Sequence, residues 1–496
     1  MFITGAGAAE KNSVVMKTFA GICSAFLGLS LLVPQAQAQH QEDALVYRAD
    51  VVVVGAGSAG LSSAIEAADH KARVLILEKM PIIGGNSSQA AGYMIAVPPQ
   101  DSERTEKSVR QKVVDMMMRE GGPSADENKI RQIVDASRGT IAWLRELGAD
   151  LKNTDALTVA GTPVAYLPAT GVFTVGEEVI KTLVRQVELR NIPMLTLTQV
   201  TAVTRDEEGE INGVRAVMGD GRKIEVRAPS VILTTGGFGA SDQLMERYLK
   251  LPYPMSSTNL PGTTGDGLIM GQELGARVVN LDAAMIHVTT LPFSGLVIPM
   301  QARSAGGILV NEKGHRFTNE LSSDLEPFYE RADGRAWLIV DQDIVDSYPA
   351  LRNYAQSGFM ERGRTDEELA RLIRVSPETL VEELSRYRSL VRHQSDTDFG
   401  RPTMKSYLTH YPLYAINVRP GIQSTLGGLY TNARAQVLYT SGAPIRGLFA
   451  AGEVTGGIFG ARRLEGSSLT ASIVYGRIAG AEAANFASAL HQAKKH

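Results

Sequence analysis

The sequence predicts an α/β protein in which a Rossmann-like, dinucleotide-binding domain is interrupted by an inserted α+β domain. Three observations lead to this fold class. A four-valine strand runs into a Gly-x-Gly-x-x-Gly turn at residues 50–60, a second apolar strand follows at residues 73–77, and the same strand-and-glycine character returns near residue 448. The expected boundaries are 45–280 and 416–490 for the nucleotide-binding domain and 281–415 for the inserted domain.

The glycine turn predicts a nucleotide site. Four valines in a row fit a strand buried on both faces. Gly55, Gly57 and Gly60 let the chain turn tightly, so that free N–H groups of the next helix face a pyrophosphate that a side chain would block. Glu78 lies roughly 20 residues further on, where a βαβ unit places the acceptor for a ribose hydroxyl. This arrangement favours FAD or NAD over NADP.

Three later features are expected beside the same ligand. A glycine pair followed by Asn86 and Ser87 suits a loop that lies close to a flat ligand. An apolar strand at residues 230–234 ends in a turn at Gly236 and is expected to rejoin the sheet. Asp266 begins a helix, where a negative charge is favoured.

Two segments predict structure rather than chemistry. Residues 124–127 indicate a capping box that opens a helix running through Leu147. Apolar residues alternate over 194–217 around a turn at 208–210, which predicts an antiparallel pair of strands. Mixed helices and short strands dominate residues 281–415.

Composition limits the function. The chain has 496 residues, a net charge of −3 and 44% hydrophobic residues, so it can bury a large core and has no basic excess for nucleic acid. Residues 1–38 resemble a secretory signal with upstream residues, since an apolar run at 19–33 precedes an Ala-x-Ala site at 36–38. We expect Sec export to the periplasm and no permanent membrane anchor, because the run is shorter than the ~20 residues of a membrane span.

Cysteine usage limits the redox chemistry. Cys23, the single cysteine, lies within the signal-like segment, so cleavage after Ala38 leaves none. Such a chain cannot hold c-type haem through CxxCH, a thiolate-bound iron–sulfur cluster or a redox disulfide, and no metal site is predicted. We expect an organic cofactor and electrons that come from outside the chain.

Together, the motifs resemble the flavoprotein family of soluble fumarate reductases, whose relatives include urocanate reductase, other periplasmic enoate reductases and ketosteroid dehydrogenases. The matching segments are 55–60, 78–86, 235–239, 264–267 and 451–464. The resemblance implies a glutathione reductase-type FAD domain with a mobile capping domain. It also implies non-covalent FAD, because the loop at 85–87 lacks the histidine that related membrane-bound enzymes attach to flavin. Cofactor contacts are then assigned to Gly55, Gly57, Ala59, Gly60, Glu78, Asn86, Ser87, Ala91, Gly92, Gly236, Asp266, Ser424, Glu453, Ser468 and Leu469.

In that family the substrate is an α,β-unsaturated carboxylate. Flavin N5 gives hydride to the β carbon, an arginine gives the proton to the α carbon, and a further arginine with histidines holds the carboxylates. The resemblance places Arg463 at the carboxylate-holding position with Gly466 following, His287 at a substrate histidine, and Arg303 in the proton-delivery path. A guanidinium suits this grip because it makes two parallel bonds to one carboxylate.

Three departures from the family pattern narrow the substrate. Pro299 and Met300 replace a Thr-Glu pair, Gln423 and Ser424 replace a histidine pair, and Asp324 stands where the catalytic arginine is expected. Burying a second carboxylate without partners would cost several kcal/mol. A monocarboxylate of the acrylate, methacrylate or cinnamate type therefore fits better than fumarate, with Gln423 as a substrate contact.

The proton donor and some alternatives stay open. Arg303, a tyrosine such as Tyr329 or Tyr407, or Asp324 could donate the proton, although Asp324 would be ionised at neutral pH unless its pKa were raised above ~4. The electron donor expected is a separate c-type cytochrome. Alternative functions are a fumarate or urocanate reductase, a ketosteroid-dehydrogenase-like flavoenzyme and a non-catalytic flavin electron carrier.

Overall fold

The predicted nucleotide-binding sheet is present. The computed structural model describes residues 44–170, 173–251, 255–292, 294–322 and 324–493. Its main six-stranded sheet comprises β20 (Gln436–Leu438), β21 (Pro444–Ala450), β11 (Ser230–Leu233), β2 (Val51–Val54), β3 (Val74–Leu77) and β7 (Met194–Leu195), in that order. All neighbours are parallel except β20, which is antiparallel to β21. The strands predicted at 73–77 and 230–234 are thus present as β3 and β11, and both pair with β2.

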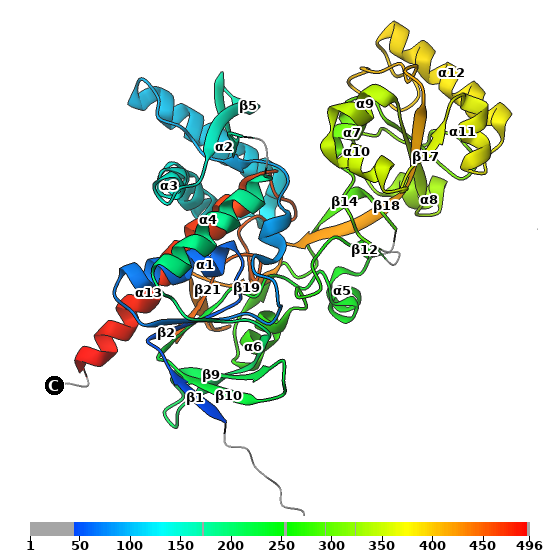
Figure 1. Cartoon of the computed structure of the whole chain (residues 1–496). Coiled ribbons are helices and arrows are strands. Elements are labelled where there is room, and N and C mark those ends of the chain that lie inside the picture. The colour runs from blue at the N-terminus through cyan, green and yellow to red at the C-terminus, as the bar shows by residue number, and fades with distance from the viewer. Residues whose placement is uncertain (1–43, 171–172, 252–254, 293, 323, 494–496) are drawn as a thin grey trace, which may run out of the picture. The chain divides into compact units, whose positions relative to one another are not determined.

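Two long helices cover this sheet and pack against each other. Figure 1 shows α1 (Ser58–Asp69) alongside α13 (Ser467–Ala493), with α4 (Val175–Leu189) close by. The contact is tight because α13 presents glycines. A Cβ on Gly476 would lie 2.6 Å from the carbonyl oxygen of Ala59, and one on Gly480 would lie 2.3 Å from that of Ser63.

Three smaller sheets complete this part of the chain. The expected antiparallel pair is present as β8 (Thr198–Arg205) and β9 (Ile211–Met218). Two strands not expected from the sequence, β10 (Lys223–Arg227) and β1 (Leu45–Arg48), extend that sheet in the order β1-β10-β9-β8. The second sheet comprises β4 (Met94–Ile95), β6 (Thr162–Pro168) and β5 (Leu151–Val159), in that order. The third comprises β13 (Val278–Val279), β19 (Gly428–Tyr430) and β22 (Thr455–Gly456), in that order.

The helix predicted from a capping box begins later than expected. It is α3 (Glu127–Glu146), and its N-cap is Asp126, whose carboxylate accepts the N–H groups of Asn128 and Lys129. Ser124 lies instead in the short 3-10 turn η2 (Gly122–Ser124). The remaining helical segments of the region are η1 (Gly85–Gln89), α2 (Glu103–Gly121), α5 (Asp242–Leu249) and α6 (Asp266–Glu273).

A separate hydrophobic cluster lies between Val288 and Val418 and involves a second six-stranded sheet. That sheet contains β12 (Ser256–Ser257), β14 (Ala284–Thr290), β15 (Ile308–Val310), β16 (Ala336–Val340), β17 (Glu361–Gly363) and β18 (Leu413–Thr425). Its helices are α7 (Met300–Ser304), α8 (Glu326–Ala332), α9 (Gln342–Ser347), α10 (Pro349–Gln356), α11 (Asp366–Leu372) and α12 (Pro377–His393). The long strand β18, orange in Figure 1, runs through the expected domain boundary at 415–416.

Within the described residues, no helix combines the length and apolar character needed to cross a membrane. The signal-like segment at 1–38 lies outside those residues.

Candidate active site

The first glycine turn has room only for glycine. Gly55 has a φ of +105°, and a Cβ on it would lie 2.5 Å from the carbonyl oxygen of Thr234 at the end of β11. A Cβ on Gly60 would lie 1.9 Å from the carbonyl oxygen of Gly55. The turn from β2 into α1 is thus as tight as its glycine spacing predicts.

Glu78 braces this turn from the end of β3. One carboxylate oxygen accepts the N–H of Ala56 at 2.8 Å, and the other accepts the N–H of Met80 at 2.8 Å. Each oxygen of a carboxylate can accept a second bond. Glu78 can therefore hold the loop and still accept a ribose hydroxyl, and that contact with the cofactor stays a prediction.

The loop that carries Ser87 faces the start of α1. The N–H of Ser58 donates to Ser87 Oγ at 3.2 Å, and the two hydroxyl oxygens are 2.8 Å apart. A Cβ on Gly57 would meet Ser87 Oγ at 3.6 Å and the carbonyl oxygen of Gly84 at 3.7 Å, so it would fill the space in front of the helix. The two loops form a cradle at a helix N-terminus, which suits a pyrophosphate.

Asp266 is engaged within the protein. Its carboxylate forms an ion pair with Lys79 at 2.9 Å and also accepts from Thr264 and Gln199. The contacts tie the start of α6 to the segment after β3, while the cofactor role expected for Asp266 stays a prediction.

Glu453 is the centre of a polar group beyond β21. Its carboxylate accepts the N–H of Thr425 at 2.9 Å and Nδ2 of Asn86 at 3.4 Å, and Asn86 also donates to Asn259 at 2.6 Å. Burial raises the pKa of Glu453, and these bonds together with the charge of Arg463 oppose the rise. Asn86 and Glu453 were predicted beside the cofactor. No sequence pattern indicated Asn259, whereas Thr425 could have been identified from its position before a late glycine pair.

Arg463 is partly buried, whereas its neighbour Arg462 is exposed. Burial lowers the pKa of Arg463, and the charges of Glu453 and Glu465 oppose the fall. Its Nε is shielded from solvent and has no hydrogen-bond partner among the described residues. A buried guanidinium with an unused donor is a site for an anion.

A β-bulge places Gln423 and Ser424. Met285 on β14 pairs with Ser424 on β18, but the next residue, Ile286, pairs with Ile422, so Gln423 is the extra residue. Such bulges redirect side chains beside active sites. Ser424 is buried, and its hydroxyl also lacks a partner among the described residues.

His287 lies on β14, opposite Gly421 of β18. Burial, and secondarily the charge of Arg303, lowers the pKa of His287 to about 4, so the imidazole is neutral at pH 7. Nδ1 lies 2.9 Å from the carbonyl oxygen of Thr289 and 3.3 Å from the main-chain nitrogen of the same residue, so it donates to the first or accepts from the second according to the tautomer. With the proton on Nδ1, His287 can donate to a carboxylate only after Nε2 takes up a second proton, whereas with the proton on Nε2 the neutral ring can donate directly.

Arg303 is on α7 and is 4% exposed. Burial lowers the pKa of Arg303 to about 10, with Glu320 opposing and Arg401 adding to the fall. Nη1 donates to the carbonyl oxygen of Glu320 at 2.5 Å, while Nε is buried and has no partner in the described part of the chain. Its charge also contributes to the lowered pKa of His287.

The other candidate proton donors differ in their surroundings. Asp324 is exposed, and its carboxylate accepts the N–H of Glu326 at 3.1 Å at the start of α8. Tyr407 is 41% exposed, whereas Tyr329 is partly buried beside Gly334. Arg303 is the most buried of these candidates.

Of the remaining predicted residues, Gly92, Gly466, Ser468 and Leu469 lie around the start of α13, whereas Gly236 follows β11 and lies beside Thr263. Gly466 has a φ of +80°, and a Cβ there would lie 2.6 Å from the ring of Tyr93. Of the others, Leu469 is buried, Gly92 and Ser468 are partly buried, Ala91 is exposed and Gly236 has a φ of +74°.

These observations fit FAD. The Gly57 cradle suits the pyrophosphate, Glu78 retains acceptor capacity for the ribose, and Ser424 has a buried hydroxyl without a partner in the described chain.

Comparison with known proteins agrees with this geometry. The model of the FAD binding domain family matches residues 50–469. The chain is 34% identical over 446 residues to "Fumarate reductase (cytochrome)" from Shewanella frigidimarina, covering 88% of this chain and 77% of the relative. It is 28% identical to "NADH:acrylate oxidoreductase" from Vibrio harveyi, covering 88% of this chain and 50% of the relative.

A solved structure shows the same fold. The open conformation of a flavocytochrome c3 fumarate reductase superposes with a TM-score of 0.79 at 32% identity, covering 89% of this chain and 79% of the other.

Proposed function

Because the chain belongs to the FAD-binding flavoprotein family of the soluble fumarate reductases, we propose that it reduces the C=C bond of an α,β-unsaturated monocarboxylate. The observation that carries this proposal is the side chain of Arg463. Its Nε is shielded from solvent and has no partner within the described residues, and its charge interacts with that of Glu453. A carboxylate would supply that partner through two parallel charge-assisted bonds.

Arg463 has both a binding and an electronic role. By holding the carboxylate it fixes the position of the adjacent double bond. It also stabilises the negative charge that develops on the carboxylate side as the β carbon is reduced. Bound FAD supplies the hydride equivalent for that carbon. His287, neutral at pH 7, adds a hydrogen bond to the carboxylate when its Nε2 carries a proton.

Arg303 is the proton donor in this proposal. Its pKa of about 10 keeps the guanidinium charged at neutral pH, yet makes it a stronger acid than an ordinary arginine. It is buried and its charge acts on His287, whereas Asp324 is exposed and accepts a backbone N–H at the start of a helix. The proton goes to the α carbon, which balances the hydride added at the β carbon.

The proposed preference for a monocarboxylate substrate rests on three residues that differ from the family pattern. Pro299 and Met300 replace a Thr-Glu pair, and Gln423 replaces a histidine. Pro299 precedes α7, Met300 begins it with 42% of its surface exposed, and Gln423 occupies the β18 bulge. None of them offers a cation to a second carboxylate, which would cost several kcal/mol to bury without partners. The similarity to a relative named for acrylate supports this choice.

The proposals for electron donor, cofactor attachment and compartment rest on the sequence. We propose periplasmic export because residues 1–38 resemble a secretory signal, and non-covalent FAD because the loop at 85–87 has no histidine. We propose reduction by a separate c-type cytochrome because the single cysteine lies in the signal-like segment. Rapid turnover of the purified protein with NADH alone would make the cytochrome unnecessary.

The test is a panel of enoates assayed with reduced methyl viologen. Acrylate, methacrylate or cinnamate should be reduced faster than fumarate or urocanate. Arg463→Lys keeps the charge but loses the two-bond geometry, so kcat/KM should fall about 100-fold, equivalent to about 3 kcal/mol. Arg462→Ala, which changes an exposed neighbour, is the control and should retain activity.

Three outcomes would contradict parts of the proposal. A clear preference for fumarate would contradict the monocarboxylate assignment. Enoate reduction unchanged in Arg463→Lys would remove the binding role of Arg463. A protein that reacts with artificial dyes but reduces no enoate would be an electron carrier.

A further inference from the structure

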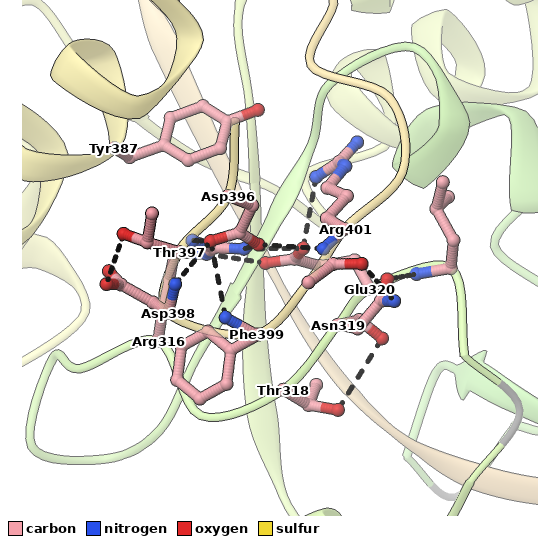
Figure 2. A network of polar contacts seen from close by, with 12 residues as sticks. Arg316, Thr318, Asn319, Glu320, Tyr387, Asp396, Thr397, Asp398, Phe399 and Arg401 are labelled. Carbon is pink, nitrogen blue, oxygen red and sulfur yellow. Dashed lines mark hydrogen bonds and ion pairs between the residues drawn. The ribbon is translucent and has the colours of Figure 1, made fainter. Parts of the chain in front are cut away.

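Four buried charged side chains form a closed network next to α7. Arg316 donates to Glu320 at 2.9 and 3.0 Å and to Asp396 at 3.0 Å, and Arg401 donates to Glu320 at 3.1 Å. None of the four side chains is exposed to solvent, and their charges cancel. Figure 2 shows Glu320 and Asp396 between the two arginines.

The network holds Arg303 at two points. Arg401 donates to the main-chain carbonyl of Arg303 and, at 3.0 Å, to that of Gly307. Glu320 accepts from the guanidinium of Arg303 through its own main-chain carbonyl at 2.5 Å. One contact holds the backbone of α7 and the other holds the end of the side chain.

Stability alone does not account for such a cluster. Replacing buried ion pairs by apolar side chains of similar size is often neutral or stabilising, because desolvation offsets the Coulomb attraction. A closed network does fix the positions of its side chains, because each charged group has several partners. Two members of this network, Glu320 and Arg401, contact Arg303, whose Nε has no partner in the described chain.

We propose that Glu320 is the positioning residue for Arg303, acting with Arg401 to present the guanidinium beside His287 in the orientation that delivers the proton. This inference rests on the proposed function. The charged or titratable groups that influence Arg303 are His287, Glu320 and Arg401.

The matched test compares Glu320→Gln with Asp396→Asn in the FAD-loaded protein. Each variant removes one negative charge from the same buried cluster, but Asp396 contacts Arg316 and the backbone of residues 398–401, not Arg303. We expect Glu320→Gln to lower kcat about 100-fold with KM within two-fold, because Arg463 still binds the carboxylate. In Glu320→Gln the pH at which kcat falls on the alkaline side should be about one unit lower than in the wild type, because the negative charge that raises the pKa of Arg303 is lost. Asp396→Asn should leave that pH unchanged.

A second variant keeps the charge of the cluster. Arg401→Lys cannot reach both main-chain carbonyls with a planar fork, so it should also lower kcat at nearly constant KM. It serves in place of Glu320→Gln if that protein does not fold.

A spectroscopic readout does not depend on turnover. In protein labelled with [15N]arginine, the Nε–Hε signal of Arg303, assigned by its loss in Arg303→Lys, should broaden in Glu320→Gln and stay sharp in Asp396→Asn. Equal kcat losses and equal spectra in the two variants would overturn the positioning role. A wild-type protein that reduces no enoate would instead overturn the proposed function, and the spectra would still decide whether Glu320 orders Arg303.

Discussion

Substitution of His287 should change how stability depends on pH. Its pKa is about 4 in the folded protein against 6.5 for an ordinary histidine. Between these values the unfolded chain binds a proton that the folded protein excludes, so stability is full above pH 6.5 and falls as the pH drops toward 4. The difference of 2.5 units corresponds to at most about 3 kcal/mol, an upper limit because the imidazole is only partly buried.

His287→Gln removes this contribution while keeping a polar side chain. The assay is urea unfolding of both FAD-loaded proteins at pH 4, 5, 6 and 7, with the free energy of unfolding extrapolated to water. The wild-type value should fall relative to the variant by up to about 3 kcal/mol between pH 7 and pH 4, since all other titrations are shared. His315→Gln, at an exposed histidine beside Glu383, is the control for losing an imidazole. A difference between wild type and His287→Gln that stays constant with pH would refute the reasoning.

Two further substitutions test the packing of the site. In Gly237→Ala the new Cβ would lie 2.6 Å from a carboxylate oxygen of Glu453, so the protein should purify with less flavin absorbance, whereas Gly139→Ala, which meets no atom within 4 Å, should not. Arg316→Met leaves Glu320 and Asp396 buried without that partner and should cost about 3–5 kcal/mol in urea unfolding. Arg386→Met, at an exposed arginine that pairs with Asp398, is the control and should destabilise the protein much less.

The nucleotide-binding sheet could be predicted because its constraints are local and steric. The positive φ of Gly55 and the 1.9 Å approach of a Gly60 Cβ to the Gly55 carbonyl leave no other residue type. Glu78 was predictable for the same reason, since its distance along the chain from the turn places it at the end of the next strand. The start of α3 was wrong by a few residues because two capping side chains compete there, and Asp126 caps the helix while Ser124 is in a 3-10 turn.

The network of Arg316, Glu320, Asp396 and Arg401 could not be predicted, because its members lie far apart in the sequence. Arg316 and Asp396 are separated by 80 residues, and Arg401 meets Glu320 across 81. In a sequence such residues indicate a solvated surface, and only the fold shows that they are buried together. The bulge at Gln423 could not be predicted for a similar reason, because the register of β18 depends on its partner strand β14.

The buried charges around the site make a final, independent prediction about the substrate. Arg463 and Arg303 carry two positive charges, Glu453 carries one negative charge when ionised, and His287 is neutral. The network of Arg316, Glu320, Asp396 and Arg401 has no net charge, and Glu465, which also acts on Arg463, is exposed to solvent and therefore screened. A monoanion therefore neutralises the site, whereas a dianion leaves one charge in excess. Because burial raises the pKa of Glu453 and a nearby anion raises that of His287, the excess should draw a proton onto one of them.

Calorimetric titration in buffers of different ionisation enthalpy measures this proton uptake directly. Fumarate should bind the oxidised, FAD-loaded protein with uptake of about one proton at pH 7, and acrylate with nearly none. His287→Gln should reduce the uptake with fumarate if the imidazole is the acceptor, and leave it unchanged if Glu453 is. Equal uptake with the two acids would mean that the site does not distinguish their charges, and the monocarboxylate assignment would then lose its electrostatic basis.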